Sequence, residues 1–171
     1  MVVIITGTIG IGKTTVCKKV IEIARSRGYS CGGIVTYKTR NEDIIIEDIQ
    51  TGEIRDLAST HNIYQGLRTA MYFFNPEGID FGIRAIEKGV TSDVLVVDEL
   101  GQLELSGQGF VKVIDQIAAG KIKNCILVIR KSLLSSFIPK LGITTSVFEI
   151  TINNRNHLPN EISMVAFGNH P

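Results

Sequence analysis

The order of apolar and polar positions along the chain predicts strands that alternate with helices. Short runs rich in apolar and β-branched residues are typical of buried strands, and they cover residues 2–6, 32–37, 94–97, 125–129 and 146–152. Apolar residues spaced three or four apart indicate helices that begin near Lys13, Ile79, Phe110, Ser132 and Pro159. This alternation favours an α/β fold, in which right-handed crossovers build a mainly parallel sheet with helices on both faces.

Two regions depart from the simple alternation. The strand-like runs 44–49 and 53–57 are joined by the turn sequence Gln50-Thr51-Gly52, which predicts an antiparallel hairpin added at the edge of the parallel sheet. The mixed residues 67–74 are compatible with one more short strand. Near the other end, Pro139 is expected to stop the short helix over 132–137, because proline removes a backbone donor.

The composition is that of an ordinary globular protein. The chain has 171 residues, of which 44% are hydrophobic and 20% charged, and we expect one domain over residues 1–171. The net charge is +1 and the Lys and Arg residues are scattered, so nothing points to a nucleic-acid partner. No apolar run approaches the roughly 20 residues that span a bilayer, and the N-terminus does not have the pattern of a signal peptide.

The cysteines bear on the cellular compartment. There are three of them, with no C-x-x-C motif. Cys17 and Cys125 fall in apolar patterns and are expected to be buried, small hydrophobic residues. This usage favours a reducing, cytoplasmic setting.

The most informative motif is G-x-x-x-x-G-K-[ST] over residues 7–14. In such phosphate-binding loops, glycines let backbone N–H groups curl around phosphate oxygens, the lysine reaches the β- and γ-phosphates, and the hydroxyl ligates Mg²⁺. The motif lies between a predicted strand and a predicted helix, whose N-terminus favours anions. We therefore predict a nucleotide site made of Gly7, Thr8, Ile9, Gly10, Ile11, Gly12, Lys13, Thr14 and Thr15.

A second polar element, Asp98-Glu99, directly follows the apolar run 94–97. The carboxyl end of that strand lies on the same rim as the phosphate loop, so Asp98 is predicted to hold Mg²⁺ together with Thr14. The adjacent Glu99 could accept a proton from a water that attacks the γ-phosphate, which favours hydrolysis over simple binding. We therefore add Asp98 and Glu99 to the nucleotide site and predict Lys13 and Glu99 to be catalytic.

The glycine-rich segment 101–109 leaves two interpretations open. It could be a mobile segment that closes over the nucleotide, or a plain connection between a strand and a helix. Its Glu104 is a candidate second carboxylate, although a solvated loop acid is the simpler interpretation.

Together these motifs resemble a known family. The pairing of GTIGIGKTT near the start with VVDELGQLEL in the middle is similar to the small P-loop nucleoside-triphosphatases of thermophiles, whose vertebrate member is called cancer-related NTPase. Residues 32–36 and the Thr-x-x-Asn-Arg sequence at 151–155 are also similar to that family. The resemblance implies a three-layer P-loop NTPase fold and Mg²⁺-dependent hydrolysis of ATP, GTP and other nucleoside triphosphates with loose base preference.

Phosphoryl transfer also needs positive charge on the γ-phosphate beyond the lysine and the metal. Several cations could supply it, or could simply be exposed to solvent; they are Arg68, Arg84, Arg130, Lys131 and Arg155. The family signature makes Arg155 the preferred member of the nucleotide site, in contact with phosphate or base.

Two other functions use the same residues. A nucleotide or small-molecule kinase would pass the phosphoryl group to an acceptor in place of water, and would need an acceptor pocket. A nucleotide-dependent switch would use slow hydrolysis to regulate a protein partner, which the sequence does not identify.

Overall fold

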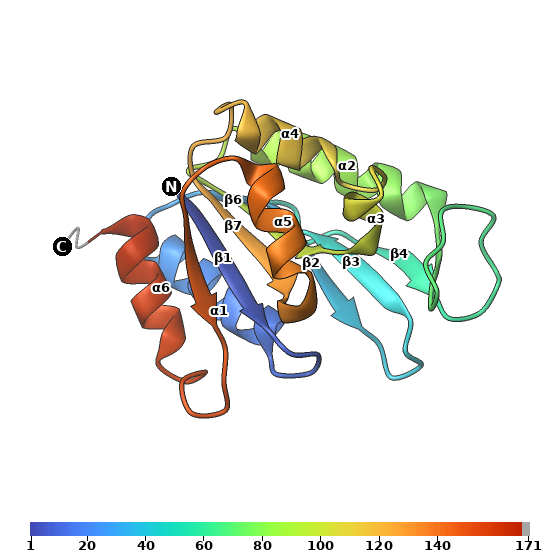
Figure 1. Ribbon diagram of the computed structural model, residues 1–171, viewed down its shortest axis with the longest axis horizontal. Helices are drawn as coiled ribbons and strands as arrows, with labels where there is room; N and C mark the ends of the chain where they lie inside the picture. The colour runs from blue at the N-terminus through green and yellow to red at the C-terminus, as the bar shows by residue number, and fades with distance from the viewer. Residues whose placement is uncertain (169–171) are drawn as a thin grey trace.

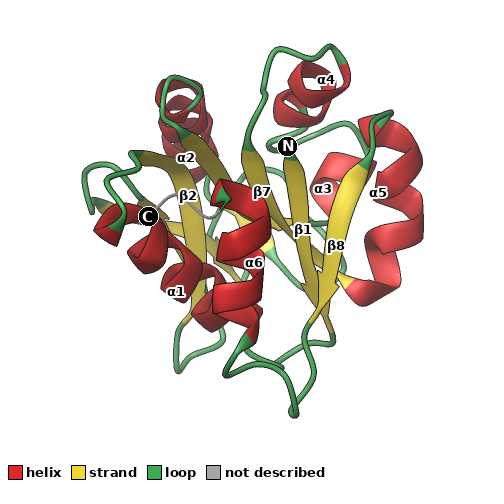
Figure 2. Ribbon diagram, turned by 90° about the vertical axis from the view of Figure 1, so that its left-hand side faces the viewer, coloured by secondary structure: helices red, strands yellow, loops and turns green. Residues whose placement is uncertain are grey.

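The computed structural model describes residues 1–168 and contains one eight-stranded sheet between two layers of helices (Figures 1 and 2). The strands are β1 Val2–Gly7, β2 Cys31–Lys38, β3 Ile44–Asp48, β4 Ile54–Ser59, β5 Phe73–Phe74, β6 Val94–Leu100, β7 Cys125–Arg130 and β8 Thr145–Glu149. The helices are α1 Lys13–Ser26, α2 Pro76–Gly89, α3 Gln102–Leu105, α4 Lys112–Ala118, α5 Leu134–Leu141 and α6 Leu158–Phe167, with a 3₁₀ turn at Lys131–Leu133 before α5. In this part of the chain, no helix is long and apolar enough to cross a membrane.

The sheet confirms the predicted α/β class and the added hairpin. Its strand order is β5-β4-β3-β2-β6-β7-β1-β8. The five strands from β2 to β8 in this order pair in parallel, whereas β3, β4 and β5 extend the sheet beyond β2 in antiparallel fashion. The two-residue β5 falls within the region 67–74, where one more short strand was expected.

Alternation along β1 divides the core into two halves. Val3 and Ile5 pack with α1 and α6 on one face, while Ile4 joins the cluster formed with α2, α4 and α5 on the other face. Figure 1 shows α1 and α6 on one side of the sheet and the remaining helices on the opposite side. Because β1 is buried along its whole length between β7 and β8, the loop that follows it starts from a rigid base.

The three cysteines are free and buried, as predicted for Cys17 and Cys125. Burial raises the pKa of the Cys125 thiol to about 12, and it raises that of Cys17 as well. These thiols are therefore inert packing groups at neutral pH.

Two predicted boundaries were wrong. Pro139 lies inside α5 and does not end it; the helix ends at Leu141, and the next residue, Gly142, caps it in the left-handed conformation with φ 63°. Strand β8 ends at Glu149, so the residues up to 152 that were predicted as strand instead enter the loop before α6. The exposed Ile152 explains this error, because an apolar residue extended the sequence pattern without being buried.

Candidate active site

The phosphate loop connects the buried end of β1 to the first turn of α1. Gly10 and Gly12 adopt left-handed φ values of 77° and 104°, which glycine reaches without strain. A Cβ added at either position would meet nothing within 4 Å, so it is conformation and not space that requires these glycines. The loop is consequently open on the side where phosphate oxygens would bind, above the N-terminus of α1.

Lys13 holds a cationic group inside this loop. Its side chain donates a hydrogen bond from Nζ to the carbonyl oxygen of Thr8 at 3.0 Å, and the residue is only 7% exposed. Burial lowers the pKa of Lys13, and the nearby Glu99 carboxylate opposes that shift. When a nucleotide binds, its anionic phosphate can therefore replace the neutral carbonyl of Thr8 as the hydrogen-bond partner of the Lys13 ammonium group.

Asp98 and Thr14 form the place where a divalent ion would fit. Asp98 is 1% exposed; burial raises its pKa to about 7, and a side-chain hydrogen bond with Thr14 acts in the opposite direction. Its Oδ2 atom has no hydrogen-bond partner among the described residues. A buried, unpartnered carboxylate oxygen beside a hydroxyl is a donor set that Mg²⁺ prefers, with phosphate and water oxygens completing the coordination.

Glu99 interrupts the regular pairing between β6 and β7. Asp98 pairs with Val128 and Leu100 with Ile129, so Glu99 is an extra residue in the ladder, as in a β-bulge. Its side chain is 21% exposed and accepts a hydrogen bond from Nε of Arg130 at 2.5 Å. Because Arg130 pairs with Gly7 in the β1–β7 register, this ion pair lies beside the phosphate loop.

These elements enclose a cleft of about 370 Å³. Besides the phosphate loop, Glu99 and Arg130, its walls come from the end of β2, the start of β3 and the segment before β5; the lining residues from these walls are Thr36, Tyr37, Lys38, Ile44, Met71 and Tyr72. These residues were not predicted to belong to the site. Residues 36–38 could have been found, because they lie at the carboxyl end of a parallel strand, where ligands bind in such sheets.

The structure does not bring every predicted cation to this cleft. Arg155 is exposed in the loop after β8, where its backbone N–H bonds to the carbonyl of Thr151, and it is not among the described residues that line the cleft. Its contact with nucleotide therefore stays a prediction. Lys131 pairs with Glu149 at 2.6 Å on an exposed surface. Of the cations considered, Arg130 is the one that lines the cleft.

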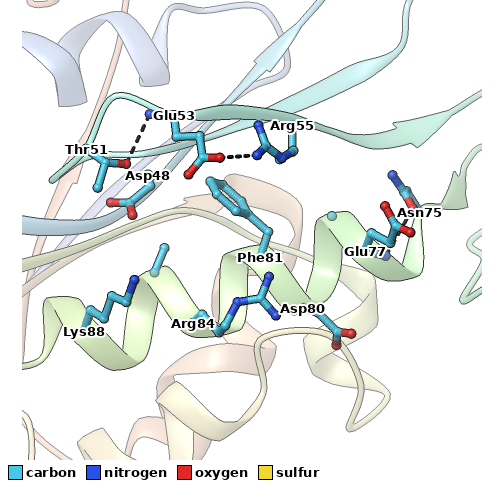
Figure 3. Close-up of a pocket in the computed structure, with 12 residues that line it drawn as sticks. Asp48, Thr51, Glu53, Arg55, Asn75, Glu77, Asp80, Phe81, Arg84 and Lys88 are labelled. Carbon is cyan, nitrogen blue, oxygen red and sulfur yellow. Dashed lines mark hydrogen bonds and ion pairs between the residues drawn. The ribbon is translucent and has the colours of Figure 1, made fainter.

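Arg84 lies in a different cavity, of about 340 Å³, between the β3–β4 hairpin and α2. Figure 3 shows Arg84 and Lys88 on α2, with the Glu53–Arg55 ion pair on the opposite wall. Its lining shares no residue with that of the nucleotide cleft. The mixture of exposed acids and bases here is ordinary for a solvated surface hollow.

The segment 101–109 is a folded connection held by Glu104. Residues 102–105 form α3, and Glu104 is only 4% exposed, so the expectation of a solvated acid was wrong. Its carboxylate accepts hydrogen bonds from the backbone N–H of Gly101 at 2.7 Å and of Phe110 at 3.0 Å. Burial raises the pKa of Glu104. The Glu104 side chain thus connects Gly101, the first residue of the segment, to Phe110, which directly follows it. It is not among the residues that line the nucleotide cleft.

Comparison with known proteins identifies the family. A family model described as NTPase matches residues 2–163. The chain belongs to this family. Relatives named nucleoside-triphosphatase THEP1 include that of Thermotoga maritima, 33% identical over 96% of this chain and 95% of the relative, and that of Methanosarcina barkeri, 30% identical over 93% of each.

Solved structures confirm the P-loop NTPase fold. The crystal structure of THEP1 from Aquifex aeolicus matches with a TM-score of 0.77 at 22% identity, covering 98% of this chain and 99% of that one. The solution structure of a human cancer-related nucleoside triphosphatase matches with a TM-score of 0.74 at 23% identity, covering 99% and 98%. The family suggested by the two sequence motifs is confirmed over nearly the whole chain by the family model, which matches residues 2–163.

Proposed function

We propose that the chain is a Mg²⁺-dependent enzyme that hydrolyses ATP, GTP and other nucleoside triphosphates to the diphosphate and phosphate. Its family membership makes it a nucleoside-triphosphatase. The observation that best supports the metal-dependent mechanism is the unpartnered Oδ2 of buried Asp98 beside Thr14, at the edge of an open phosphate loop. Three free, buried cysteines support a cytoplasmic location as part of the same proposal.

In this mechanism the loop amides of residues 8–14 and the ammonium of Lys13 bind the β- and γ-phosphates. Thr14 and Asp98 would hold the metal, which neutralises charge on the phosphate oxygens when bound. The phosphate loop does not select the nucleobase, because its backbone amides contact phosphate alone. Selection of the nucleobase is therefore left to the rest of the cleft, and loose preference is part of the same proposal.

Glu99 orients the attacking water and accepts its proton. The carboxylate is partly exposed and lines the cleft with Lys13, so it lies within the space that the γ-phosphate and water would share. Arg130 holds the Glu99 carboxylate in place and brings a second cation to the same space. Charge that spreads over the transferring phosphoryl group is then stabilised by Lys13 and Arg130.

The test is release of phosphate from ATP, GTP, CTP and UTP by purified protein, with Mg²⁺ or with excess chelator. All four should be hydrolysed with Mg²⁺, and chelation should abolish turnover. Lys13→Ala should reduce turnover at least 100-fold, whereas Lys19→Ala, an exposed position on the same helix, should behave as wild type. Full turnover by Lys13→Ala, or in the presence of chelator, would refute the proposal.

A further inference from the structure

A second cavity opens directly beside the nucleotide cleft. Its volume is about 230 Å³, and it lies between the end of β4, the segment 69–74 and the start of α3. Six residues line both spaces: Thr36, Ile44, Met71, Tyr72, Glu99 and Arg130. The two cavities therefore meet at the Glu99–Arg130 pair, which is where the γ-phosphate is expected.

The walls of this second cavity are apolar and already folded. Leu57, Phe74, Leu103 and Phe110 contribute apolar side chains. On one side, Glu104 fixes the wall through its bonds to the two ends of the segment 101–110. On the other side, a turn closes the wall, with the N–H of residue 69 bonded to the carbonyl of residue 72 at 2.9 Å. A ligand would thus enter a preformed pocket.

The charges in this cavity argue against an anionic ligand. Among the described residues that line it, Arg130 is the only cation, and it is already paired with Glu99 at 2.5 Å. The other acid, Glu104, is satisfied by backbone donors. An anionic group placed here would lose water, and the cationic donors left to it on Arg130 are those that the transferring phosphoryl group uses, which makes its burial unfavourable.

The volume of the cavity suits a small ligand. An apolar cavity of about 150 Å³ accommodates benzene, so about 230 Å³ admits one ring with a short substituent. The ring would contact Phe74, Tyr72 and Phe110, and the substituent would point toward Glu99, the polar end of the cavity.

We propose that this cavity binds an uncharged, one-ring alcohol and that the enzyme transfers the γ-phosphoryl group of the nucleotide to its hydroxyl oxygen. This inference rests on the proposed function, because it uses the same bound triphosphate. The bond between the γ-phosphorus and the β–γ bridging oxygen breaks, and a bond forms between that phosphorus and the hydroxyl oxygen. Glu99 accepts the hydroxyl proton, and the products are a phosphomonoester and the nucleoside diphosphate. Hydrolysis is then the reaction when water occupies the acceptor position.

Phosphorus NMR of the purified protein with ATP and Mg²⁺ distinguishes the products. The neutral probes are benzyl alcohol, pyridinemethanol and hydroxymethylbenzamide, and the anionic comparator is hydroxymethylbenzoate, which has nearly the shape of the amide. We expect a phosphomonoester signal with at least one neutral probe and at least tenfold less ester from the benzoate than from the amide. Phosphate release without ester from any probe would overturn this inference and leave the proposed hydrolysis intact. Absence of both products would refute the proposed function itself.

A pocket-filling variant tests the location. Ala70 is an exposed residue that lines the second cavity and not the nucleotide cleft, so Ala70→Trp can fill the cavity with little risk to folding. The ratio of ester to free phosphate should fall at least tenfold. Ala119→Trp, at an exposed position after α4, is the matched control and should keep the wild-type ratio. An unchanged ratio in Ala70→Trp would overturn the assignment of the acceptor to this cavity.

Discussion

Arg130 donates a hydrogen bond from Nε to Oε1 of Glu99 at 2.5 Å, across the neighbouring ends of β7 and β6. The pair is partly exposed, with 37% of the arginine side chain and 21% of the glutamate side chain accessible, so its contribution to folding is expected to be small. Its position at the junction of two cavities gives it a role in chemistry instead. The guanidinium can hold the carboxylate and contact a transferring phosphoryl group at the same time, since it carries five donors.

We predict that Arg130→Ala lowers kcat for phosphate release about 100-fold or more, because a cation beside the γ-phosphate is removed. Arg130→Lys should recover only part of the loss, since an ammonium group lacks the planar fork of donors. Arg84→Ala, on the separate surface of Figure 3, is the matched control and should leave kcat unchanged. A larger loss in Arg155→Ala than in Arg130→Ala would instead support the contact predicted from the sequence signature.

The second prediction concerns Glu99. Glu99→Gln keeps the shape of the side chain and a hydrogen-bond acceptor for Arg130, but it cannot take a proton from water. Turnover should fall by about 10²–10⁴, while the affinity for a fluorescent triphosphate analogue should change less than threefold. Measuring both quantities separates catalysis from binding, and turnover near the wild-type rate would exclude Glu99 as the base.

The third prediction concerns the stability of the segment 101–110. Glu104→Ala removes the acceptor for two backbone N–H groups, those of Gly101 and Phe110. Since unsatisfied buried donors are costly, the free energy of unfolding should fall by about 2–4 kcal/mol, measured by urea denaturation. Glu22→Ala, at an exposed position on α1, should change it by less than about 0.5 kcal/mol. Equal effects of the two substitutions would show that Glu104 does not hold the segment.

Much of the fold follows from local sequence. The apolar runs of β1, β6 and β7 are short and rich in β-branched residues, which is typical of buried strands. Residues 7–14 carry their own loop conformation through glycines such as Gly10 and Gly12. The carboxylates after β6 could be assigned to the phosphate rim, because all parallel strands end on the same side.

The choice among the candidate cations and the second cavity could not be predicted, because both depend on strands that are neighbours in space and not in sequence. Strand β7 lies between β6 and β1, and this places Arg130 rather than Arg155 in the cleft. The second cavity is likewise lined by residues far apart in the sequence, from Thr36 to Arg130. Glu104 shows a different limit, since a buried acid that bonds to backbone has the same sequence signal as a solvated loop acid.

The last prediction concerns the contact between α2 and β2, the strand whose last residues, Thr36 to Lys38, line the cleft. A Cβ on Gly89 would lie 2.4 Å from the backbone nitrogen of Gly33 and 2.8 Å from the carbonyl carbon of Gly32. Because α2 and the backbone of β2 must move apart to make room, Gly89→Ala should lower the free energy of unfolding by about 3 kcal/mol or more.

The matched control for this contact is Gly120→Ala. Gly120 has a left-handed φ of 68° but nothing within 4 Å of an added Cβ, so its replacement should cost only the conformational strain, about 1–2 kcal/mol. Urea denaturation of both variants compares close packing with backbone strain in one protein. If Gly120→Ala were the more damaging substitution, the helix would have room to move away from β2, and the position of the cleft wall would not depend on this contact.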